Sequence, residues 1–96
     1  MKELSIVSSE FCTPEDLQEY IRTKLDFPDY YGGNLSALYD CLTESTEELF
    51  LEFDLDNFDN EEIKNYIKKV LKVCEDAVEE NELLELLITF PEEEGW

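Results

Sequence analysis

Histidine is absent from this 96-residue sequence, and its absence excludes several kinds of site. Serine–histidine and cysteine–histidine catalysis need an imidazole base, and many metal sites use an imidazole nitrogen as a ligand. A phosphate-binding glycine loop is also missing, because Gly32 and Gly33 lack the lysine and the spacing of that motif. We therefore expect a protein that is not an enzyme and that uses no cofactor and no metal ion.

Basic side chains are few, with 7 Lys and Arg against 26 Asp and Glu and a net charge of −19. Nucleic acids and anionic membranes would be repelled, so neither is expected as a partner. A basic protein is favoured, because the negative field would speed its approach. The one basic cluster lies at 64–72, and Lys72 stands four residues before Asp76, which indicates pairing along a helix.

Long hydrophobic runs are also missing. The longest apolar-rich stretch, 83–90, is too short to cross a membrane and is interrupted by Glu85, and no secretory signal is recognisable. The three cysteines, Cys12, Cys41 and Cys74, are odd in number and far apart, which predicts reduced thiols and a cytoplasmic location. Cys41 and Cys74 fall on the apolar faces of predicted helices, so we expect both to be buried.

The remaining pattern alternates strands and helices. Strands are predicted at 4–7, 49–53 and 83–90, and helices are predicted after the capping residues Thr13, Asn34 and Asn60. The apolar run at 49–53 is nearly continuous, which is typical of a strand covered on both faces. We predict an α/β fold in one domain spanning 1–96, with a three-stranded parallel sheet, three or four flanking helices and a short acidic tail at 91–96.

One stretch, 27–43, stands out with the sequence FPDYYGGNLSALYDCLT. Its helix has an apolar face and a second face that carries Ser36, Tyr39, Asp40 and Thr43, and two tyrosines precede it. Two interpretations remain open on pattern alone. The second face is either an ordinary solvated surface or a contact surface for a cationic partner, since aromatic anchors beside one charge are typical of binding hot spots.

The segment 28–43 resembles the barstar family, small intracellular inhibitors of a secreted bacterial ribonuclease. The resemblance is carried by a proline, an acidic residue, Tyr-Tyr-Gly, Asn-Leu, Ala-Leu, an aromatic residue and Asp-Cys-Leu-Thr. The layout of strands and helices agrees over the rest of the chain. The resemblance implies an inhibitor that blocks the active site of a basic, barnase-like ribonuclease, where acidic residues take the place of RNA phosphates. We expect the free inhibitor to be a monomer.

The resemblance also implies roles for individual residues. Asp40 would be the central carboxylate at a phosphate position, and Tyr30 would stack near the catalytic imidazole of the enzyme. The layout of the third helix places Asp76 at an acidic contact position and Glu80 at the same edge. Further residues that would line the contact are Asn34, Leu35, Tyr39 and Thr43.

Three positions in this region depart from the family pattern. Ser36 stands where an acidic residue is expected, Tyr39 replaces a tryptophan, and Glu44 replaces a glycine. These departures favour a different cognate enzyme, or weaker binding to the barnase-like ribonuclease that the resemblance implies. An alternative function is therefore an immunity protein that neutralises a different nuclease or toxin through the same helix face.

A third interpretation is a calcium-responsive acidic module built on Asp54, Asp56 and Asp59. This segment lacks the glycine that a calcium loop needs at its sixth position. Asn65 also stands where a glutamate should close the loop, so an ordinary acidic connection is favoured.

Overall fold

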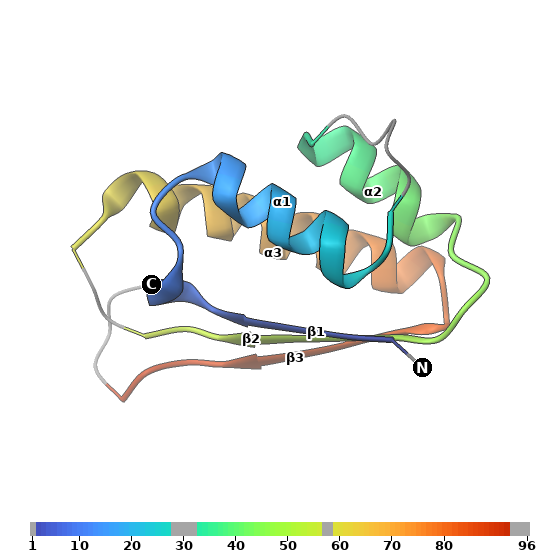
Figure 1. Cartoon of the computed structure of the whole chain (residues 1–96). Coiled ribbons are helices and arrows are strands. Elements are labelled where there is room, and N and C mark those ends of the chain that lie inside the picture. The colour runs from blue at the N-terminus through green and yellow to red at the C-terminus, as the bar shows by residue number, and fades with distance from the viewer. Residues whose placement is uncertain (1, 28–32, 57–58, 93–96) are drawn as a thin grey trace.

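The computed structural model describes residues 2–27, 33–56 and 59–92. Three strands, β1 (Lys2–Val7), β2 (Leu49–Asp54) and β3 (Leu84–Thr89), form a parallel sheet in the order β1-β2-β3. The α-helices are α1 (Pro14–Lys24), α2 (Leu35–Thr43) and α3 (Glu61–Glu80), and a short 3₁₀ helix, η1 (Ser8–Glu10), follows β1 (Figure 1). The predicted α/β fold with its parallel three-stranded sheet is confirmed.

Each α-helix begins directly after the capping residue that the sequence predicted. In each case the side-chain oxygen of the cap accepts a hydrogen bond from a backbone N–H three residues later, a group that the helix itself leaves without a partner. The three pairs are Thr13 with Asp16 (3.2 Å), Asn34 with Ala37 (2.8 Å) and Asn60 with Ile63 (3.2 Å). The start of each of these three α-helices is therefore fixed by its local sequence.

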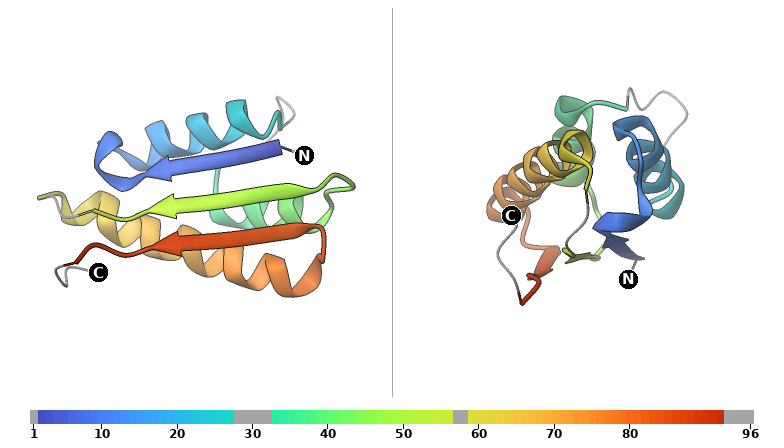
Figure 2. Two further views of the ribbon diagram at one scale, coloured as in Figure 1. Left: turned by 90° about the horizontal axis from the view of Figure 1, so that it is seen from below. Right: turned by 90° about the vertical axis from the view of Figure 1, so that its left-hand side faces the viewer.

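All three α-helices lie on the same face of the sheet, so the prediction that β2 is covered on both faces is wrong (Figures 1 and 2). Leu49, Leu51 and Phe53 point towards the helices and are buried, whereas Phe50 and Glu52 on the other face are only half-buried. The reason is topological. Parallel crossovers share one hand, and a strand order without reversal places every crossover helix on one side.

The helix α2 packs on α3, and Figure 1 shows it farther from the sheet than the other two helices. Leu38 and Leu42 of α2 are each 1% exposed and belong to the hydrophobic core between the helices and the sheet. The opposite side of α2 faces outwards. Within the described ranges, none of the helices combines the length and the hydrophobicity that crossing a membrane requires.

The three cysteines are free thiols in different environments. Cys74 is buried in α3, as predicted, whereas Cys12 is exposed. The prediction of full burial is wrong for Cys41, which is half-buried. It borders an open hollow near the end of α2, which Leu25 and Glu44 also line, so one side of its thiol is not covered by the core.

Candidate functional site

The outward face of α2 carries a row of polar side chains at four-residue spacing. Ser36, Asp40 and Glu44 are all exposed, and residues four apart on a helix lie one above another on the same side. The core residues Leu38 and Leu42 occupy the opposite side of the helix. The predicted polar face is confirmed at Ser36 and Asp40, whereas its other two members, Tyr39 and Thr43, are half-buried.

Asp40 is the central carboxylate of this row. In the part of the chain that the structure describes, no side chain or backbone donor bonds to its carboxylate. It lies in the last turn of α2, where the helix dipole is negative and where α2 has no basic residue. Its charge is therefore uncompensated within the described residues.

The thiol of Cys41 responds to the negative field around this part of α2. Burial raises the pKa of Cys41, and the negative charges of Glu44 and Asp40 raise it further. Both carboxylates disfavour the thiolate because a second negative charge nearby costs free energy. The negative charges of Asp40 and Glu44 at the end of α2 would likewise attract a cation.

Two neighbouring residues of the predicted site have structural tasks as well. Tyr39 is half-buried against the hydrophobic core, so only part of its ring is available to a partner. The Thr43 hydroxyl donates back to the backbone carbonyl of Tyr39 at 2.9 Å, with a longer contact of 3.2 Å to that of Asp40. Its hydroxyl hydrogen is therefore used inside the helix, and its oxygen remains as an acceptor.

Two further predicted site residues lie at the beginning of α2. The side-chain oxygen of Asn34 accepts the capping hydrogen bond from Ala37, and Leu35 packs partly against the core. Gly33 precedes them with a φ of 65°, a left-handed conformation that glycine adopts without strain. Tyr30, the remaining predicted residue before α2, lies outside the described residues.

The acidic residues predicted on the third helix lie on α3, the helix that packs against α2. Asp76 is half-exposed and pairs with Lys72, whose Nζ lies 3.1 Å from its carboxylate oxygen. The hydrogen bond and the charge of Asp76 raise the pKa of Lys72. Glu80 is exposed at the end of α3. Asp76 thus differs from Asp40, because its charge already has a partner.

Asn81 is a positioning residue that is not among the predicted site residues. It ends α3 by donating its backbone N–H to the carbonyl oxygen of Ala77. Its buried side-chain amide also donates to the carbonyl oxygens of Leu42 and Ser45, both at 3.0 Å, and its side-chain oxygen accepts from the N–H of Leu83. Asn81 therefore fixes the end of α2 to the connection between α3 and β3.

The described residues contain no group of three acidic, cysteine or histidine side chains that could hold a metal ion. Asp56, one of the three residues considered for a calcium loop, accepts hydrogen bonds from within the protein through its carboxylate. The oxygen Oδ1 accepts from the Ser8 hydroxyl at 2.5 Å and from the Ser9 N–H at 3.0 Å. These contacts join the chain just after β2 to η1, so Asp56 has a structural role.

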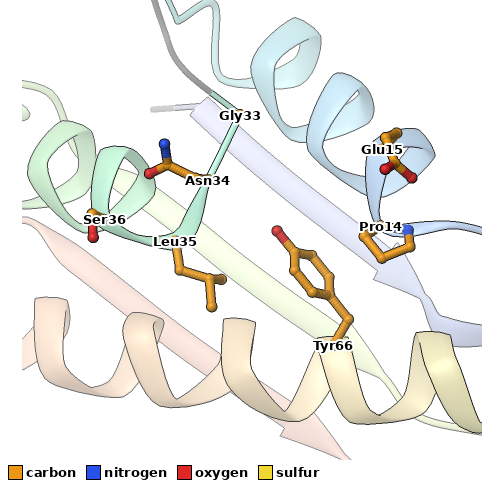
Figure 3. A pocket seen from close by; sticks show the side chains of 7 residues that line it. All are labelled: Pro14, Glu15, Gly33, Asn34, Leu35, Ser36 and Tyr66. Carbon is orange, nitrogen blue, oxygen red and sulfur yellow. The ribbon is translucent and has the colours of Figure 1, made fainter.

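A hollow of about 540 Å³ lies beside the beginning of α2 (Figure 3). It is bounded by the first turn of α1, the first turn of α2 and one aromatic ring from α3. Its lining residues are Pro14, Glu15, Gly33, Asn34, Leu35, Ser36 and Tyr66. Three of these, Asn34, Leu35 and Ser36, belong to the predicted contact surface, so the hollow adjoins that surface.

Comparison with known proteins decides the family. A family model described as Barstar (barnase inhibitor) matches residues 1–90. The chain belongs to the barstar family. A Bacillus subtilis (strain 168) protein named "Putative ribonuclease inhibitor YrdF" is 43% identical to the chain over 82 residues, which cover 83% of this chain and 89% of the relative. The similarity to the barstar family is therefore not confined to the segment 28–43. It extends over residues 1–90 of this chain.

Proposed function

We propose that this protein inhibits a basic ribonuclease by inserting the outward face of α2 into the active site of the enzyme. The exposed, unpaired carboxylate of Asp40 is the observation that carries this proposal. Membership of the barstar family and the name of the Bacillus subtilis relative support it. The inhibitor catalyses nothing, since its action is to occupy the place of the substrate.

The mechanism uses the similarity between a carboxylate and a phosphate. A ribonuclease binds RNA phosphates with arginine and lysine, and arginine grips carboxylates and phosphates alike through two parallel hydrogen bonds. Asp40 fills a phosphate position, while Tyr39 and Leu35 exclude water around it. Exclusion of water strengthens the charge pair and makes it costly to remove either partner.

The net charge of −19 gives the proposal a kinetic side. A strongly acidic inhibitor associates with a basic active site faster than a neutral protein of the same size would. Added salt screens this attraction. The proposal therefore includes a rate of association that falls as the salt concentration rises.

Calorimetric titration against a panel of basic secreted ribonucleases, with barnase included, tests the proposal. Asp40→Ala should weaken binding by at least about 30-fold, because loss of one partner of a buried charge pair costs about 2–5 kcal/mol, a range drawn in part from the barnase–barstar pair itself. Glu92→Gln changes the net charge equally in the exposed tail and should bind as the unmodified chain does. Equal affinities for both variants would refute the assigned surface.

A second candidate is an immunity protein that uses the same face against another nuclease or toxin. The uncharged Ser36 at the beginning of the polar row of α2 and the added carboxylate of Glu44 favour it, because both change the charge pattern that the partner must match. Ser36→Asp distinguishes the two. The substitution should tighten binding to barnase if the partner is barnase-like, and should weaken binding to a partner that is matched to serine.

A further inference from the structure

We propose that the hollow between α1, α2 and α3 receives an arginine side chain of the partner ribonuclease, with Glu15 and Tyr66 as its contact residues. This inference rests on the proposed function and extends its binding surface to α1. The first turn of α1 and the ring of Tyr66 are not among the positions that the sequence pattern indicated. Four observations support the inference.

The first observation is the fixed position of Tyr66. Figure 3 shows its ring rising from α3 into the hollow, with the hydroxyl directed to the space between α1 and α2. The phenol oxygen accepts a hydrogen bond of 2.5 Å from the side-chain amide of Gln18, which is itself buried in α1. Tyr66 is half-buried. A ring that is held in place and partly open is a suitable anchor, because little side-chain entropy remains to be lost on binding.

The second observation is continuity with the proposed binding surface. Tyr66, Val73 and Glu80 are seven residues apart, so they follow one another along a single side of α3, and Asp76 lies next to this row. Tyr66 also shares the hollow with Ser36 of the exposed α2 row. One partner can therefore contact Asp40 and the hollow together.

The third observation is the charge around the hollow. Glu15 is exposed at its edge, and no donor in the described ranges bonds to the Glu15 carboxylate. Glu62 lies one turn before Tyr66 on α3, and Lys69 lies nearly one turn after it. Because Glu15 and Glu62 outweigh this single lysine, the surroundings of the ring favour a cation.

The fourth observation is the chemistry of the lining. An aromatic ring and a carboxylate that line the same hollow fit a guanidinium group, which can stack on a ring with its face and bond to a carboxylate with its edge. An ammonium group is more strongly hydrated and lacks this planar fork. The hollow therefore supplies on α1 the negative charge that Ser36 does not supply on α2.

Binding to barnase, used as the probe enzyme, tests the contact. Tyr66→Leu should weaken binding about tenfold, whereas Tyr66→Phe, which keeps the ring, should weaken it about twofold or less. Glu15→Gln should weaken binding about threefold, and its matched control Asp16→Asn, on the same turn of α1 but outside the hollow, should have no effect. Asp40→Ala reports on the proposed function separately. A large effect of Asp40→Ala with none from Glu15 or Tyr66 would overturn this inference alone.

Nuclear magnetic resonance titration with N-acetyl-arginine amide tests the hollow without any enzyme. The Tyr66 ring and the amides of 33–36 should shift in a saturable way, and Glu15→Gln should reduce the affinity about threefold, while Asp16→Asn and Asp40→Ala should leave it unchanged. N-acetyl-lysine amide should bind more weakly. Shifts spread evenly over the acidic surface, or equal affinities for Glu15→Gln and the unmodified chain, would overturn the inference whatever the enzyme experiment shows.

Discussion

The side-chain amide of Asn81, at the end of α3, lies 3.0 Å from the carbonyl oxygen of Leu42, in the last turn of α2. The last carbonyl groups of a helix have no partner within it, and a buried carbonyl without a partner costs free energy. The Leu42 carbonyl accepts the Ser45 N–H at 3.3 Å, and Asn81 supplies a second, shorter bond from 39 residues away. The position of the acidic end of α2 thus depends on a residue outside the proposed contact surface.

Asn81→Ala should therefore lower the free energy of unfolding by about 2–3 kcal/mol, because it removes the buried side-chain bonds to the carbonyls of Leu42 and Ser45 and to the N–H of Leu83. Urea unfolding measures this loss. Asn81→Asp has the same shape but no amide donor and should be at least as destabilising. A loss below about 0.5 kcal/mol for Asn81→Ala would show that the bonds to α2 contribute little.

Asp40→Asn should stabilise the free protein while it weakens binding. A negative charge in the last turn of a helix opposes the helix dipole, and its removal is worth about 0.3–1 kcal/mol at low salt. Thermal unfolding should show a higher Tm for the variant, and the gain should shrink as salt is added. Glu92→Gln is the control for net charge alone. An equal rise in Tm for Asp40→Asn and Glu92→Gln would show that the charge of Asp40 does not destabilise α2 through the helix dipole.

The stability conferred by Asp56 should depend on pH in the acidic range. Burial disfavours its charge, but the hydrogen bonds from Ser8, Ser9 and its own backbone N–H together lower the pKa of Asp56 below its ordinary value. A lowered folded-state pKa gives stability that is complete above the unfolded-state pKa, about 4, and is lost as the pH falls through the folded-state value.

Ser8→Ala should consequently cost most at neutral pH, and its cost should diminish below about pH 4, where the carboxyl is protonated in the unfolded chain. Urea unfolding of the unmodified chain and of Ser8→Ala, from pH 7 to pH 3, measures the difference between their free energies of unfolding. Asp59→Asn, at an exposed carboxylate of the same segment, is the control. A cost of Ser8→Ala that stays constant across this range would contradict the role of the Asp56 charge.

The three thiols should react with a disulfide reagent in a fixed order at pH 8. Cys12 is exposed and should react first, and Cys41, half-buried with a raised pKa, should follow slowly. Burial, with a smaller contribution from Glu75, raises the pKa of Cys74 to about 12, so this thiol should react only after unfolding. Cys12→Ser should abolish the fast phase. A fast phase that remains in this variant would contradict the order.

The sequence predicted the elements that depend on nearby residues. Thr13, Asn34 and Asn60 begin their helices because each bonds to an N–H only three residues away. The core face and the exposed face of α2 could also be predicted from the sequence, because the helical period places Leu38 and Asp40 on different sides of the helix. These features require no knowledge of the rest of the chain.

Features that depend on distant residues were not predictable in the same way. The half-exposed Phe50 lies in an apolar run, and only the strand order and the placement of every helix on one face explain its exposure. The contact of Gln18 with Tyr66 joins residues 48 apart and has no local pattern. The hollow beside α2 likewise arises from three helices together, so no single stretch of sequence indicates it.

Steady-state inhibition kinetics test the central claim most directly. RNA cleavage by the panel ribonuclease that binds the chain most tightly is measured at several RNA concentrations, with the unmodified chain and with Asp40→Ala. The account predicts competitive inhibition, in which the inhibitor raises the apparent KM and leaves kcat unchanged, and a loss of inhibition by at least about 30-fold in Asp40→Ala. A lowered kcat at saturating RNA, or equal inhibition by Asp40→Ala, would contradict occlusion of the active site by α2.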